Sequence, residues 1–197
     1  MTVNTILVFD TETTGLLPKN ISKVDIKNLP YVVQMSWVIF DLELKQIIKT
    51  KDYIVKVDSH IANSDIHGIN DLISQEKGVE IGGVLKEFFC DIKEVDLLVA
   101  HNYSFDSSMI EIELLRLKRN LEIKYFKKRD YYCTMMGTID FCELESKFYG
   151  SFKYPKLCEL YELMFGYQFE NQHNSLADVN ATLRCYLKFV HDINLYN

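Results

Sequence analysis

The chain has 197 residues, of which 48% are hydrophobic and 25% are charged, as in an ordinary soluble globular protein. This length predicts one domain, residues 1–197, with a full hydrophobic core. No apolar run approaches the roughly 18 residues of a membrane span, and the N-terminus lacks the pattern of a secretory signal, so no membrane partner is expected. The net charge of −6 is unusual for a nucleic-acid-binding protein. It does not exclude one, because divalent cations held by clustered acids would make a pocket locally positive.

The cysteines are odd in number, are scattered along the chain and never form a CxxC pair. They are Cys90, Cys133, Cys142, Cys158 and Cys185. This usage argues against both a disulfide framework and a zinc site. It predicts a reducing compartment, and therefore an intracellular, cytoplasmic protein.

The first stretch with a chemical signature is Ile6–Leu16, in which an apolar run ends in Asp10-Thr11-Glu12-Thr13-Thr14-Gly15-Leu16. The run predicts a strand buried on both faces, and the spacing of Asp10 and Glu12 places both carboxylates on one face of an extended chain. Two acids held this close repel each other unless a cation lies between them or one carries a proton. Mg2+ suits the pair, because it binds a couple of carboxylates and keeps waters for a phosphate. The stretch alone is equally compatible with a polar turn in solvent.

The elements that follow predict an α/β protein. We expect a loop at 17–30 between two prolines, then strands at 31–42 and 46–57 joined by a hairpin, and a short helix or turn within 58–75. Helical periodicity covers 81–92, a short strand follows at 97–100, and the next helix is expected from about Ser107 to Arg119. A further short strand is expected at 131–133, and helices at about 134–145, 156–165 and 176–190. This order predicts a mixed sheet flanked by helices, with ligands gathering beyond the strand ends, where Asp10, Glu12 and Asp106 are expected.

Two later motifs complete the candidate site. The strand at 97–100 runs into His101-Asn102-Tyr103-Ser104-Phe105-Asp106, and the last predicted helix begins after His173-Asn174-Ser175-Leu176-Ala177-Asp178. A spacing of five does not place His173 and Asp178 on one helical face, but it suits a histidine in the preceding loop and an aspartate in the first turn. Taken alone, Asp178 also fits a helix-capping pattern with Ser175, and His173 fits a surface loop.

Together, the three motifs resemble those of the DEDDh 3′→5′ exonucleases, a family that includes ribonuclease T and the proofreading epsilon subunit of bacterial replicase. The D-x-E-T-T-G-L motif matches Asp10–Leu16, H-N-x-x-F-D matches His101–Asp106, and H-x-x-x-x-D matches His173–Asp178. The resemblance covers essentially the whole chain. It implies a ribonuclease H-like fold, in which three antiparallel strands are continued by shorter parallel ones.

The resemblance also implies the chemistry. Two divalent cations, Mg2+ or Mn2+, would be held by four acids, with His173 as the general base. The implied catalytic set is Asp10, Glu12, Asp106, His173 and Asp178. The implied contacts to the terminal nucleotide are Thr13, Leu16, His67, Asn102 and Phe105, although Phe105 is equally compatible with a core position.

The substrate expected from the resemblance is the single-stranded or frayed 3′ end of DNA or RNA, with DNA favoured and a polymerase or repair partner allowed. An exoribonuclease that trims RNA is the alternative enzyme. Ala62 stands where some relatives carry a glutamate that contacts the substrate end, which leaves the DNA-or-RNA preference open. A vestigial nuclease acting as a binding module is the non-enzyme alternative. The basic residues Lys124, Lys127, Lys128 and Arg129 fit either a guide for a phosphate backbone or a solvated surface.

Overall fold

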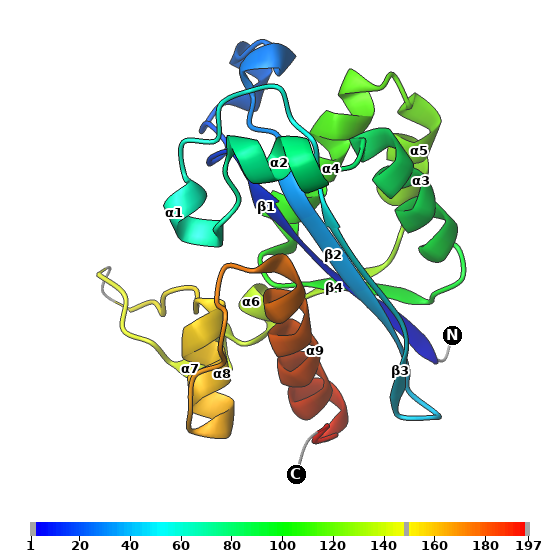
Figure 1. Cartoon of the computed structure of the whole chain (residues 1–197). Helices are drawn as coiled ribbons and strands as arrows, with labels where there is room; N and C mark the ends of the chain where they lie inside the picture. The colour runs from blue at the N-terminus through cyan, green and yellow to red at the C-terminus, as the bar shows by residue number, and fades with distance from the viewer. Residues whose placement is uncertain (1–2, 148–149, 196–197) are drawn as a thin grey trace.

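The structure is a computed structural model that describes residues 3–147 and 150–195. Its centre is one sheet of five strands in the order β3-β2-β1-β4-β5, crossed by helices on both sides (Figure 1). Strand β2 pairs antiparallel with both β3 and β1. Strand β4 pairs parallel with both β1 and β5. The predicted ribonuclease H-like α/β architecture, three antiparallel strands continued by shorter parallel ones, is therefore confirmed.

The strands lie in the expected order, although the first extends through Thr13 and the one expected at 46–57 ends at Ile54. Their bounds are β1 Thr5–Thr13, β2 Val32–Asp41, β3 Gln46–Ile54, β4 Leu97–Ala100 and β5 Tyr131–Cys133.

The helices follow the predicted order with different boundaries in places. Their bounds are α1 Ser64–His67, α2 Asp71–Lys77, α3 Ile81–Asp91, α4 Tyr103–Arg116, α5 Asn120–Phe126, α6 Thr134–Gly137, α7 Ile139–Cys142, α8 Leu157–Phe165 and α9 Ser175–His191.

Three expectations need correction. The segment 17–30 is not wholly irregular, because it contains 3-10 turns at Ile21–Lys23 and Ile26–Asn28. Helix α4 begins at Tyr103, four residues earlier than expected, since Asn102 adopts a left-handed conformation (φ 61°) that joins β4 directly to the helix. The basic patch begins in helix α5, which the sequence did not predict and whose apolar residues pack on the core. This helix carries Lys124, and Lys127, Lys128 and Arg129 follow it.

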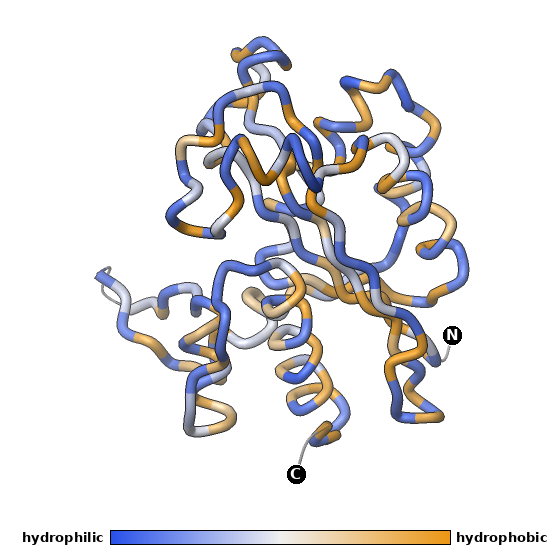
Figure 2. The backbone as a smooth tube through the Cα atoms, in the orientation of Figure 1, coloured by the Kyte–Doolittle hydropathy of each residue, from blue (hydrophilic) through white to orange (hydrophobic). Residues whose placement is uncertain are grey.

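The alternation of side chains along β1 divides the core into two layers. Leu7 and Phe9 face the large cluster formed with α3, α4 and α5. Ile6 and Val8 face the opposite side, where they meet Val179 and other apolar residues of α9. Figure 2 shows hydrophobic residues along the crossing strands and in alternation with polar ones along α9. Burial on both faces fixes the register of β1, and thus the direction in which its acids point.

Candidate active site

Strand β1 carries the first two acids inside the strand, not beyond its end as the sequence suggested. Asp10 pairs with Ser36 of β2, and Glu12 pairs with Gln34. Because side chains alternate along a strand, both acids lie on the same face as Ile6 and Val8, which is the face covered by α9.

Asp106 approaches from the opposite face, in the first turn of α4. Its carboxylate Oδ1 accepts hydrogen bonds from the backbone N–H of Thr11 at 2.9 Å and from the Thr11 hydroxyl at 2.7 Å. The residue is only 3% exposed. Thr11 lies between Asp10 and Glu12, so these two bonds bring the third acid to the same part of β1.

The fourth acid enters from the N-terminus of α9. The side chain of Asn174 accepts a hydrogen bond from the backbone N–H of Ala177 and caps the helix, which places Asp178 in its first turn. His173 lies in the preceding loop with φ 65°, a left-handed conformation that turns the chain sharply before the helix. The predicted arrangement of a loop histidine followed by an aspartate on the first turn is confirmed.

These elements bring the chemical groups close together. Glu12, His173 and Asp178 each offer one ligand atom, and the three atoms lie within 4.8 Å of one another. The Oδ2 atom of Asp10 and the Oδ1 atom of Asp178 are buried and have no hydrogen-bond partner among the described residues. A buried carboxylate oxygen without a partner is costly, and this arrangement is therefore suited to a cation.

The electrostatics of the cluster point the same way. Burial raises the pKa of Asp10 to about 7. Burial, together with the charges of Asp10 and Asp178, raises the pKa of Glu12 to about 9. The pKa of Asp178 rises to about 8, through burial and the charge of Asp10. Burial and the charge of Asp10 also hold the pKa of Asp106 well above its ordinary value. Asp10 is thus the common neighbour of the other three acids.

The donor set fits hard divalent cations. Carboxylate oxygens are the ligands that Mg2+ and Mn2+ prefer, and mutual repulsion among unneutralised acids is what such ions relieve. Asp10, Glu12 and Asp178 converge on one side of β1, while Asp106 reaches Thr11 from the other side.

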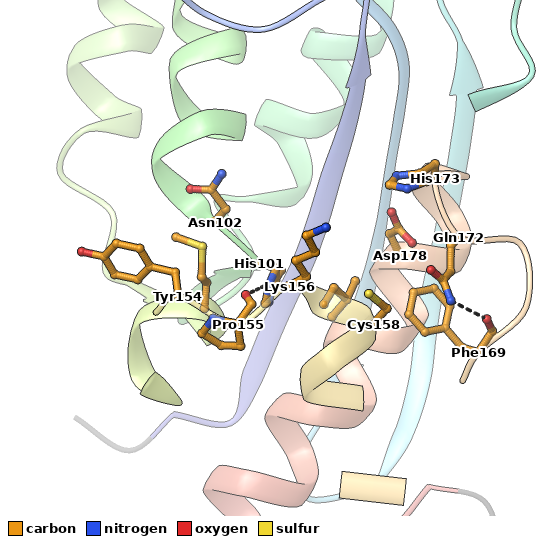
Figure 3. A pocket seen from close by; sticks show the side chains of 12 residues that line it. His101, Asn102, Tyr154, Pro155, Lys156, Cys158, Phe169, Gln172, His173 and Asp178 are labelled. Atoms are coloured by element: carbon orange, nitrogen blue, oxygen red, sulfur yellow. Dashed lines mark hydrogen bonds between the residues drawn. The ribbon is translucent and has the colours of Figure 1, made fainter. Parts of the chain in front are cut away.

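A cleft opens beside the cluster, with a volume of about 510 Å³. His173 and Asp178 lie at one side of it, and Asn102 and Tyr154 at the other, with Lys156 between them (Figure 3). The sequence matches the family described as RNase_T, exonuclease, over residues 7–186. The chain belongs to this exonuclease family. The predicted resemblance to the DEDDh enzymes is confirmed.

Solved structures agree with the fold of this chain. E. coli exonuclease I bound to a dT13 oligonucleotide superposes with a TM-score of 0.67 at 17% identity, covering 94% of this chain and 41% of that one. A 3′-exonuclease that recognises the histone mRNA stem-loop gives a TM-score of 0.70 at 16% identity, over 96% of this chain and 64% of that one. The nuclease domain of 3′hExo, a DEDDh family member bound to rAMP, gives 0.64 at 17% identity, over 99% of this chain and 96% of that one.

The chain therefore spans less than two thirds of the length of the first two of these relatives. No match to its sequence was found among curated proteins. None of the helices in residues 3–147 and 150–195 is long and apolar enough to cross a membrane.

The five residues predicted to contact the terminal nucleotide differ in their surroundings. Leu16 is 86% exposed, whereas the hydroxyl of Thr13 is buried and donates to the backbone carbonyl of Gly15. His67 is buried, and its Nε2 has no hydrogen-bond partner among the described residues. Asn102 lines the cleft. Phe105 packs against the large core cluster, which favours the structural reading of this residue.

Two of the basic residues after α5 form contacts within the chain. Lys127 pairs with Glu111 at 2.8 Å, and Arg129 donates to the backbone carbonyl of Val95. These contacts favour a structural role for both residues over a guide for phosphates.

Three positioning residues carry no signature strong enough to single them out in the sequence. Ser175 donates its hydroxyl to the backbone carbonyl of Asp10 at 2.8 Å, and its own N–H donates to Gln34 Oε1. Gln34 and Ser36 in turn donate to the same oxygen of Asp52. Thr11, which holds Asp106, differs from these three because its place between two acids is a local signal. Ser175, Gln34 and Ser36 act through contacts between distant segments, which one sequence does not reveal.

His101 has a structural position although it opens a motif. Its Nε2 lies 3.1 Å from the backbone carbonyl of Pro155, and because a carbonyl oxygen can only accept, Nε2 is the donor. In the neutral ring Nδ1 then accepts a hydrogen bond from the hydroxyl of Thr134 at 2.9 Å. Burial lowers the pKa of His101 to about 4, so the ring is neutral at physiological pH. His101 therefore ties the end of β4 to the segment that lines the far side of the cleft.

Proposed function

We propose that this exonuclease removes 5′-mononucleotides from the 3′ end of nucleic acid, in a reaction that depends on two divalent cations, Mg2+ or Mn2+. The observation that carries the proposal is the convergence of three acids on a fourth, Asp10. Two of the four, Asp10 and Asp178, present buried oxygens with no partner among the described residues. A single-stranded or frayed 3′ end is the substrate that can enter the cleft beside them.

The four acids form two candidate sets of cation ligands. Asp10, Glu12 and Asp178 would hold one cation, and Asp10 together with Asp106 would hold the second. Such ions, when bound, stabilise the attacking and leaving oxygens of an in-line displacement at phosphorus. The two hydrogen bonds from Thr11 fix the orientation of Asp106.

His173 is the candidate general base. Its side chain is exposed, and one ring nitrogen lies within 4.8 Å of ligand atoms of Glu12 and Asp178. From this position a neutral imidazole can accept the proton of the attacking water. His67 lines a hollow together with His173, and we expect it and Leu16 to hold the terminal nucleoside.

DNA is the favoured substrate, and RNA is the second candidate. The resemblance to exonuclease I, solved with dT13, supports the first, and that to 3′hExo, solved with rAMP, supports the second. The proposed catalytic residues would act in the same way on DNA and on RNA.

The test is digestion of 5′-labelled single-stranded DNA and RNA of one sequence, with free and with blocked 3′ ends, in Mg2+ or Mn2+. A ladder that shortens from the free 3′ end, with 5′-mononucleotides found by mass spectrometry, is expected, and faster shortening of DNA. Asp10→Asn is the matched control. Internal cleavage, shortening from the 5′ end, or equal activity of the control would contradict the proposal.

A further inference from the structure

The cleft beside the acids has a second wall that no catalytic role accounts for. Tyr154, Pro155 and Lys156 form this wall, directly before α8. In Figure 3 the side chain of Lys156 extends into the space between Asn102 and Asp178. Among the described residues that line the cleft, Lys156 is the one lysine, and there is no arginine.

The backbone of this wall is fixed from both sides. Pro155 is buried, and its carbonyl accepts the hydrogen bond from His101. The backbone N–H of Lys156 donates to Glu159 Oε2 at 2.9 Å. The lysine therefore projects from a defined position, although its side chain is exposed.

Among residues 3–147 and 150–195, the ammonium of Lys156 is not held in an ion pair, whereas neighbouring Lys153 pairs with Glu159 at 2.5 Å. The charge of Lys156 nevertheless helps to lower the pKa of Glu159, after burial, which raises that pKa, and the contacts from Lys153. Lys156 lines the same cleft as Asp178 but lies more than 4 Å from its carboxylate oxygens. Its charge is thus not neutralised by the acids, and it can bind a phosphate of a strand that lies along the cleft.

We propose that Tyr154 and Lys156 form a subsite for the nucleotide that precedes the terminal one, in which Lys156 binds the phosphodiester next to the scissile linkage. This inference rests on the proposed exonuclease function and deepens it. Tyr154 is 57% exposed at the rim of the cleft, and its ring offers a face on which any base can stack. The subsite therefore recognises chain length, not sequence.

The kinetic experiment compares d(TpTpT), which has a phosphodiester beyond the scissile one, with d(TpT), which has none. The readout is the ratio of kcat/KM for the trinucleotide to kcat/KM for the dinucleotide. We expect Lys156→Gln to lower this ratio about tenfold, the usual scale for a lost hydrogen bond to a charged group. Lys156→Arg should retain most of it. Lys153→Gln, which removes a charge from the same segment, is the matched control and should leave the ratio unchanged.

A binding experiment tests the subsite without hydrolysis. Fluorescence anisotropy of a labelled dT10 strand is measured in Ca2+ at several salt concentrations. Loss of one phosphate contact should reduce the slope of log K against log[salt] by about 0.7 in Lys156→Gln. Tyr154→Leu should weaken binding about tenfold and leave the slope unchanged. Thermal unfolding of each variant checks that it is folded.

The outcomes separate the two proposals. If wild-type protein hydrolyses neither oligonucleotide, the proposed function fails, and the salt slope still decides the role of Lys156. If the wild type is active but Lys156→Gln changes neither the ratio nor the slope, the subsite is wrong. An equal effect in Lys153→Gln also overturns it, because the effect would then be one of general charge.

Discussion

The hydroxyl of Ser175 donates a hydrogen bond of 2.8 Å to the backbone carbonyl of Asp10, across 165 positions of the chain. The bond joins the start of α9 to the strand that carries the first two acids. Asp178 lies three residues further along α9, almost one turn away. This contact therefore sets the separation between Asp10 and Asp178.

The first prediction follows from that contact. Ser175→Ala removes a partly buried hydrogen bond between α9 and β1, which should cost about 0.5–1.5 kcal/mol of folding free energy. The separation between the acids should also loosen, so we expect kcat to fall about tenfold or more with a smaller change in KM. Thermal unfolding and steady-state kinetics check this. Ser22→Ala, which removes an exposed hydroxyl bonded to Asn20, is the control, and an equal effect of both variants would refute the positioning role.

Asp10→Asn should abolish hydrolysis while the far-UV circular dichroism stays native. The reason is that Asp10 is the common neighbour of the other three acids, so both candidate cation sites lose a ligand. The same change removes a buried charge, and in metal-free buffer at pH 8 it should raise Tm by a few degrees, about 2–4 °C for each kcal/mol. A variant that keeps most of its activity would contradict the metal role.

The metal-free protein should lose stability as pH rises. Acids whose folded pKa lies above the unfolded value bind more protons when folded, so the stability they contribute is present below about pH 4 and is lost as pH rises through the folded values. Those values are a pKa of about 7 for Asp10, about 8 for Asp178 and about 9 for Glu12. We therefore expect these groups to lower Tm progressively between pH 5 and 9 in EDTA.

Divalent cations should reverse that loss. Binding requires the ionised acids, so Mg2+ or Mn2+ should raise Tm more at pH 8 than at pH 6 and should release protons, measurable by calorimetry in buffers of different ionisation enthalpy. Activity should vanish in EDTA and return with either ion. Cleavage that persists in chelator would contradict the dependence on two cations.

His173→Ala should slow hydrolysis about 10²–10⁴-fold near pH 7, the usual contribution of a general base. Because the exposed side chain contributes little to packing, Tm should change little. Steady-state kinetics of the variant and the wild type at pH 7 measure the loss. An unchanged rate at pH 7 would exclude His173 as the base.

The sequence predicts the sheet well because its signals are local. Apolar runs define β1 and β4, and burial on both faces determines the direction of the acids. The motifs also singled out Asp106 and Asp178 as candidate members of the acid cluster. Periodicity, however, placed the start of α4 too late. Asn102 was the cause, because a left-handed residue lets the helix begin without a loop. Ser175, Gln34 and Lys156 were missed because their roles depend on contacts between segments that are distant in sequence.

The segment 17–30 gives a last example of such a contact, centred on Arg116 at the end of α4. Its guanidinium donates to the backbone carbonyls of Ile26, Leu29 and Pro30 and lies 3.6 Å from the centre of the Tyr31 ring. It also pairs with buried Glu113 at 2.7 Å.

Arg116→Ala should therefore destabilise the fold by about 3 kcal/mol, the cost of breaking a buried pair. The backbone N–H of Thr14 donates to the carbonyl of Tyr31, and the N–H of Tyr31 donates to the hydroxyl of Thr14. Thr14 lies two residues before Leu16, so loosening this segment should disturb the proposed terminal-nucleotide site and raise KM more than it lowers kcat. Urea unfolding and kinetics measure both effects. Arg119→Ala, which breaks a more exposed pair with Glu122, should cost under about 1 kcal/mol and leave KM unchanged. If Arg116→Ala destabilises the protein but leaves KM unchanged, Arg116 supports the fold alone and the segment does not shape the site.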